Sequence, residues 1–132
     1  MKLLGRRFKK EKKTAKGTIK NALEGILYTF NTEMNFRVHL IATVLVLLAC
    51  YILEASVFEI IVCLILIGLV IAFELINTVV EVIVDMVEPR YNPLAKVAKD
   101  TAAGAVLVMA VISAVVGLII FLPKILVFIG II

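Results

Sequence analysis

Three long apolar blocks, at residues 38–53, 57–87 and 101–122, restrict what this 132-residue chain can fold into. A helix needs about 20 apolar residues to cross the hydrocarbon core of a bilayer. The third block reaches that length, and the first reaches it when extended by a few residues. The chain is 63% hydrophobic, whereas soluble domains are about 45–50% apolar. We therefore predict an all-α membrane protein, a single domain over 1–132, with transmembrane helices at 34–54, 57–87 and 101–122.

The positive charges predict how these helices are oriented. Ten of the 14 Lys and Arg residues precede or begin the first block, and the loop at 54–59 has none. The loop at 88–100 carries Arg90, Lys96 and Lys99, and Lys124 alone follows the third block. By the positive-inside rule the N-terminus and the 88–100 loop are cytoplasmic, and the C-terminus is outside. The expected location is the cell (cytoplasmic) membrane, with several passes.

Residues 14–31 predict an amphipathic helix on the membrane surface. Their apolar side chains recur at helical spacing, while Lys16, Lys20, Asn21 and Glu24 take the other face. Such a helix lies in the interface plane. Packing against a soluble partner is the alternative. The basic residues of segment 1–13 either lie against anionic headgroups or are solvated.

The stretch "ELINTVVEVIVD" at 74–85 places acids in the second block. At about 100° per residue, Glu74, Asn77, Glu81 and Asp85 fall within an arc of about 80°. A charge facing lipid at mid-membrane costs about 2.5–3.5 kcal/mol on the insertion scale, so this polar stripe must face protein, water or a cation. The first 17 or so residues of the block nearly span the core. The stripe therefore lies at the inner interface, with Glu74 deepest.

Other polar residues are expected at the same depth, namely Glu33, Lys99 and Asp100. Carboxylates combined with phosphate oxygens suit Mg²⁺. Zinc is not favoured, because the chain has one histidine and two cysteines in apolar blocks. His39 is more readily an interfacial residue than a metal ligand. A structural polar seam and a cation or proton channel remain alternatives. No P-loop motif is present, so basic side chains and metal would have to hold any nucleotide.

The stretch 74–85 resembles the signature E-x-x-N-[ST]-x-x-E-x-x-x-D of the bacterial integral-membrane diacylglycerol kinase family. "AKD" at 98–100 and "TEMNFR" at 32–37 are similar to that family too, and the likeness covers roughly residues 14–122. It implies a homotrimer with composite active sites that phosphorylates a lipid hydroxyl with Mg²⁺ and ATP, with membrane lipids around it and no nucleic-acid partner. "EMNFRVH" and the long basic N-terminus resemble the Gram-positive branch, which acts on undecaprenol. Diacylglycerol is the alternative substrate.

The resemblance also implies a role for each polar position. Glu74 matches the general base at the lipid substrate, and Glu33 and Glu81 match the glutamates that coordinate Mg²⁺. Asn77 and Asp85 match supporting polar positions. Asn21 replaces an aromatic residue that the diacylglycerol branch has near the nucleotide. The implied ATP-binding residues are Asn21, Glu33, Glu81, Arg90, Tyr91, Lys99 and Asp100.

Overall fold

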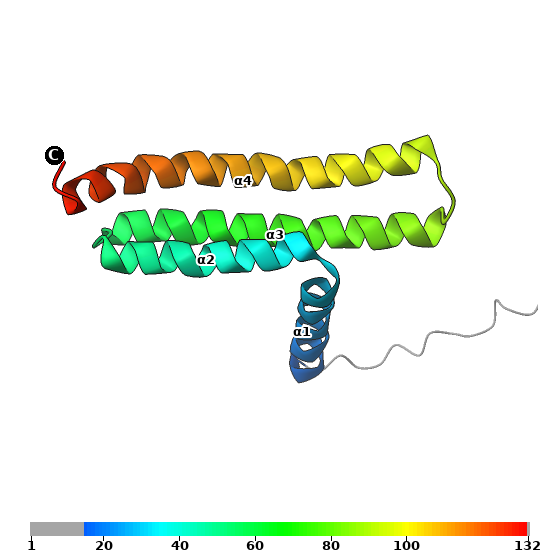
Figure 1. Cartoon of the computed structure of the whole chain (residues 1–132). Coiled ribbons are helices and arrows are strands. Elements are labelled where there is room, and N and C mark those ends of the chain that lie inside the picture. Colours follow the sequence, from blue (N-terminus) through cyan, green and yellow to red (C-terminus); the bar gives the residue numbers. More distant parts are fainter. Residues whose placement is uncertain (1–14, 132) are drawn as a thin grey trace, which may run out of the picture.

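The computed structural model describes residues 15–131 of the chain and has four helices in that range (Figure 1). They are α1 (Ala15–Thr32), α2 (Met34–Ile52), α3 (Val57–Val87) and α4 (Pro93–Phe128). The all-α class is therefore confirmed. The basic segment 1–13 lies outside the described residues.

Helix α3 is the centre of the arrangement. It runs antiparallel to α4 and packs along α2 on another side, whereas α1 projects from the start of α2 across the direction of the other helices (Figure 1). Helices α2, α3 and α4 are each long and apolar enough to cross a membrane. At 1.5 Å per residue α3 is about 46 Å long, which exceeds a hydrocarbon core of about 30 Å. Its excess length holds the polar stripe.

Helix α4 extends beyond the predicted 101–122 at both ends. It begins at Pro93, where the Asn92 side chain accepts a hydrogen bond of 2.9 Å from the Leu94 backbone N–H. Proline suits this first position because its missing N–H would have no helical partner there. At the other end the helix continues through Pro123 to Phe128. Proline is tolerated inside transmembrane helices, where neighbouring groups compensate for the lost backbone bond.

An ion pair joins α3 to α4 at the end of the bundle opposite the polar stripe. The Ser56 hydroxyl accepts from the Glu59 backbone N–H at 3.3 Å, and the Glu59 carboxylate accepts from the Ser56 N–H at 2.7 Å. This capping box fixes the first turn of α3. The same carboxylate lies 3.1 Å from Lys124 Nζ on α4. The two helices are therefore held in register at this end.

The distribution of buried residues is inverted relative to a soluble domain. Large apolar side chains are exposed along α2, α3 and α4, including Leu45, Ile65 and Leu118. By contrast, Glu74 and Asn77 are among the buried residues of the described chain. An exposed apolar surface of this extent marks contact with membrane or other protein. The outer faces of the three long helices are therefore suited to lipid or to further copies of the chain.

Candidate active site

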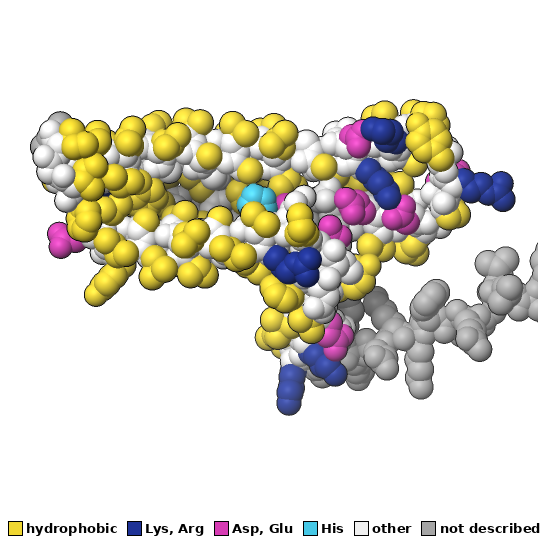
Figure 2. Space-filling view, in the orientation of Figure 1, with side chains coloured by type: hydrophobic (Ala, Val, Ile, Leu, Met, Phe, Trp, Pro, Cys, Tyr) yellow, Lys and Arg dark blue, Asp and Glu magenta, His cyan; other side chains and the backbone are white. Residues whose placement is uncertain are grey.

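Charged side chains gather at the end of the bundle where α3 turns into α4 (Figure 2). We call this region the charged end and define it as Glu33, residues 74–100 and the facing part of α2 around His39. On the face shown in Figure 2, apolar side chains cover most of the remaining length of the long helices. The stripe predicted from the sequence lies here, on α3.

Glu74 is the most buried acid of the charged end. Its side chain is 3% exposed, and its Oε1 lies 3.3 Å from Nε2 of His39 on α2. The Thr78 hydroxyl donates to the Glu74 backbone carbonyl at 3.1 Å, so it leaves the carboxylate untouched. A buried carboxylate needs a polar partner to offset the loss of hydration. His39 is that partner, and it joins α2 to α3.

Glu81 lies two helical turns from Glu74 on the same face of α3. Its Oε1 accepts a hydrogen bond of 3.2 Å from Nδ2 of Asn77, which is itself buried. Within residues 15–131 this is the one hydrogen bond recorded for the Glu81 carboxylate, and Asn77 Oδ1 has no partner there. Asn77 therefore orients Glu81 and leaves most of the acceptor positions of Glu81 available.

Asp85 and Lys99 connect α3 to α4. Lys99 Nζ lies 2.6 Å from Asp85 Oδ1, and the side chains are 35% and 62% exposed. The negative charge of Glu81 also acts on Lys99. Asp100 pairs with Lys96 one turn earlier on α4. The predicted nucleotide residues Lys99 and Asp100 are thus at the charged end, and each has an oppositely charged partner.

Glu33 stands at the start of α2. It occupies the N-cap position, and its side chain makes no capping hydrogen bond. The charges of Glu33 and Glu81 both act on Glu74, so the three acids predicted from the sequence lie near one another.

Two of these acids fit a magnesium ion that arrives with a nucleotide. The described residues contain no group of three or more His, Cys, Asp or Glu side chains positioned to hold a metal ion. Mg²⁺ needs less than that, because it is usually bound by one or two carboxylates together with waters and substrate phosphates. Glu81 has acceptor positions that Asn77 does not fill, and the Glu33 side chain makes no capping hydrogen bond, so both carboxylates suit that role.

Three predicted nucleotide residues stand apart from the side-chain contacts of Glu74, Glu81 and Lys99. Asn21 on α1 is exposed, as are Arg90 and Tyr91 in the loop between α3 and α4. None of their side chains takes part in the hydrogen bonds and ion pairs of the charged end described above. Their assignment therefore rests on the family resemblance alone.

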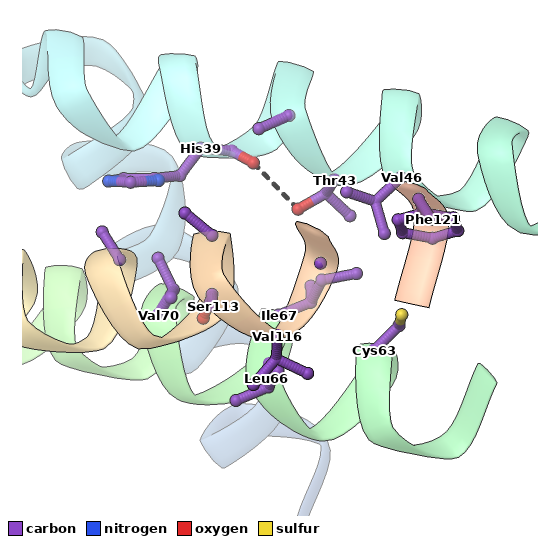
Figure 3. A pocket seen from close by; sticks show the side chains of 14 residues that line it. His39, Thr43, Val46, Cys63, Leu66, Ile67, Val70, Ser113, Val116 and Phe121 are labelled. Carbon is purple, nitrogen blue, oxygen red and sulfur yellow. Dashed lines mark hydrogen bonds between the residues drawn. The ribbon is translucent and has the colours of Figure 1, made fainter. Parts of the chain in front are cut away.

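An apolar cavity of about 260 Å³ runs along α2, α3 and α4 beside this site (Figure 3). His39 lines it at one end, and Cys63 and Phe121 lie at the other. Its hydroxyl groups, on Thr43 and Ser113, each donate at 2.8 Å to a backbone carbonyl of their own helix. The cavity is therefore apolar up to His39, which lines it and lies 3.3 Å from Glu74, a residue that does not line it.

The contact between His39 and Glu74 is the functional feature that sequence reasoning missed. Periodicity places His39 at the mouth of the first span and Glu74 at the deep end of the stripe, but it carries no information on which face of α2 meets α3. A lone histidine near the depth of a buried acid was the available signal.

The sequence profile described as "Prokaryotic diacylglycerol kinase" matches residues 20–121. "Undecaprenol kinase" of Bacillus subtilis is 47% identical over 104 residues, which cover 79% of this chain and 85% of that protein. "Diacylglycerol kinase" of Synechocystis sp. is 41% identical over 106 residues, or 80% of this chain and 61% of that protein. "Diacylglycerol kinase" of Sinorhizobium sp. is 40% identical over 83 residues, which cover 63% of this chain and 61% of that protein.

Proposed function

The chain belongs to the prokaryotic diacylglycerol kinase family, and on that basis we propose that it transfers the γ-phosphoryl group of ATP to the hydroxyl of undecaprenol. The observation that carries the choice of substrate is the 47% identity to an undecaprenol kinase over 79% of the chain. The product would be undecaprenyl phosphate. Family membership argues against a purely structural polar seam and against a channel, because the relatives are named as lipid kinases.

Glu74 is the proposed general base. Its burial beside the apolar cavity suits an acceptor that arrives from lipid, because such an alcohol presents its hydroxyl at the edge of the apolar region. The carboxylate would take the hydroxyl proton as the lipid oxygen bonds to the γ-phosphorus. The bond from that phosphorus to the β–γ bridging oxygen breaks, and ADP leaves. General base catalysis of this kind contributes about 10²–10⁴-fold.

Glu33 and Glu81 are the proposed ligands of Mg²⁺, which when bound would neutralise charge on the β- and γ-phosphate oxygens. The charge pattern on α3 supports this division of labour. Glu74 has His39 as its partner and Asp85 has Lys99, whereas Glu81 between them accepts only from Asn77 among the described residues. Among the three acids of the stripe, Glu81 is thus the one that has no positively charged or imidazole partner within the described residues.

Lys99 is the proposed contact to the transferring phosphoryl group. An ammonium has three donors, and Asp85 uses one of them in the ion pair at 2.6 Å. The remaining donors would bind phosphate oxygens while Asp85 keeps the side chain directed toward α3. Asp100, Asn21, Arg90 and Tyr91 complete the proposed nucleotide site on the strength of the family resemblance.

The proposed setting is a homotrimer in the cytoplasmic membrane, with the charged end in the cytoplasm and α1 on the membrane surface. Exposed Ile19, Leu23 and Leu27 lie on one side of α1 and support a surface position. The exposure of Arg90 and Tyr91 supports a composite site, because another copy could bring its own residues to them. Crosslinking in native membranes tests this, and a monomer that retains full activity would contradict it.

A side-by-side assay decides the substrate. Labelled ATP is supplied with undecaprenol and diacylglycerol at equal mole fraction in mixed micelles, with and without Mg²⁺. We expect labelled undecaprenyl phosphate to predominate and to require Mg²⁺. Predominant phosphatidic acid would instead assign the diacylglycerol function, which the 41% and 40% identical relatives favour. No labelled lipid from either acceptor would refute the kinase proposal.

A further inference from the structure

His39 is the sole histidine of the chain and lies on α2, outside the acidic stripe. Its Nε2 is 3.3 Å from Oε1 of Glu74, and its side chain is 23% exposed. No other side chain within residues 15–131 forms a recorded hydrogen bond or ion pair with the Glu74 carboxylate. The imidazole therefore contacts the proposed base directly and from a different helix.

The surroundings of Glu74 otherwise oppose its ionised form. Burial disfavours a charged carboxylate, and Glu74 is buried. The other charges that act on it, those of Glu33 and Glu81, are negative and repel it. A hydrogen-bond donor or a positive charge beside the carboxylate favours the charged form that can accept a proton. Among the described residues, His39 is the group placed to do so.

We propose that His39 is a positioning residue for Glu74, and this inference rests on the proposed function. The Nε2–H group donates to Oε1 and thereby fixes the plane of the carboxylate. The other oxygen, Oε2, then remains to accept the proton of the lipid hydroxyl. The same contact favours the charged form of the carboxylate over the neutral form.

The location of His39 relative to the apolar cavity supports this role. His39 lines the cavity and Glu74 does not. A hydroxyl that reaches Glu74 from the apolar side therefore passes the imidazole, and its approach is directed to the carboxylate oxygen that His39 leaves open. Figure 3 shows the imidazole at the end of the cavity, one turn before Thr43 on the same helix.

A matched pair of substitutions at His39 distinguishes loss of the hydrogen-bond donor from loss of the side-chain volume. Glutamine and methionine are both unbranched and of similar length, but only the amide of glutamine can donate a hydrogen bond. We expect His39→Met to lower kcat for lipid phosphorylation on the order of 10²-fold, since it forfeits part of the contribution of the base. The kcat of His39→Gln should be at least tenfold higher than that of His39→Met. The KM for Mg-ATP should stay within twofold in both variants.

Leu45→Met is the control. It places the same methionine on the same helix α2, at an exposed position that does not line the cavity. Its kcat should remain within twofold of the wild type. The proposal is overturned if His39→Met stays within threefold of the wild type, or if His39→Gln is as impaired as His39→Met, because neither result depends on a donor.

A second measurement needs no turnover. Hydrophobic carbodiimides modify protonated carboxyl groups in apolar surroundings, so the rate of adduct formation on Glu74 reports how much of it is neutral. The rate, followed by mass spectrometry, should rise several-fold in His39→Met and remain near the wild-type value in His39→Gln. Equal rates in all three proteins would overturn the inference even if the wild type is an active kinase. A wild type inactive on both lipids, with adduct rates as expected, would refute the proposed function and leave the His39–Glu74 contact standing.

Discussion

Replacing Glu74 by glutamine should remove activity without harming the fold. Glutamine has the shape of glutamate, and its amide oxygen can still accept from His39 at the position of Oε1, 3.3 Å from Nε2. It cannot take a proton from an alcohol at neutral pH. Loss of a general base corresponds to about 10²–10⁴-fold in rate, or about 3–5 kcal/mol in activation free energy at 1.36 kcal/mol per tenfold. We expect kcat to fall within that range.

The thermal stability of Glu74→Gln should be equal to or higher than that of the wild type, although its kcat falls. The wild-type carboxylate is buried and repelled by Glu33 and Glu81, and Glu74→Gln removes both penalties while keeping the side-chain volume. The melting temperature in detergent should therefore equal or exceed that of the wild type. ATP binding, followed by equilibrium titration with a fluorescent ATP analogue, should be retained.

Glu59→Gln is the matched control for Glu74→Gln. It makes the same change on the same helix, at the end opposite the charged end. Glutamine also serves in a capping box, so α3 should start normally while the contact to Lys124 weakens. Turnover should stay within about twofold. Turnover of Glu74→Gln within a few-fold of the wild type, measured beside this control with labelled ATP and undecaprenol, would remove Glu74 from the role of base.

The remaining predictions concern the neighbours of Glu74. Glu81→Ala should raise the Mg²⁺ concentration for half-maximal activity at least tenfold, and an unchanged Mg²⁺ dependence would contradict its role as a ligand. Asn77→Ala should raise it only two- to tenfold, because one hydrogen bond contributes about 0.5–1.5 kcal/mol; an effect as large as that of Glu81→Ala would argue for direct metal contact. Lys99→Met should lower kcat at least 10²-fold while unfolding free energy falls by less than about 1 kcal/mol, since Asp85 is largely exposed. Lys96→Met is the control for Lys99→Met. Equal losses of kcat in the two variants would contradict a contact between Lys99 and the transferring phosphoryl group.

The sequence predicted the features that depend on a single helix. The stripe of Glu74, Asn77 and Glu81 follows from helical periodicity, and its place at the end of an overlong α3 follows from counting residues against membrane thickness. The Asn77–Glu81 hydrogen bond is likewise local, since residues four apart are neighbours on a helix. Such features could be derived because the helix itself fixes their geometry.

Features that depend on how helices meet could not be derived. The contact of His39 with Glu74 requires one particular face of α2 to pack on α3, and many faces of an apolar helix are equally apolar. The residues by which α4 exceeds the apolar block at 101–122 could not be derived for a different reason. Pro93 precedes that block and Pro123 follows it, yet the first is a favoured first helical residue and the second is accommodated inside the helix.

These contacts explain how the polar stripe of α3 can carry three acids in a membrane protein. The central helix α3 holds Glu74 and Asp85 at the two ends of its stripe, and each is matched by a nitrogen from a neighbour, His39 on α2 and Lys99 on α4. These contacts tie α3 to both neighbours and leave Glu81 between them with an amide donor. A cation at Glu81 would complete a pattern in which every acid of the stripe has an electropositive partner, so binding of Mg-ATP should stabilise the fold as well as supply the substrate.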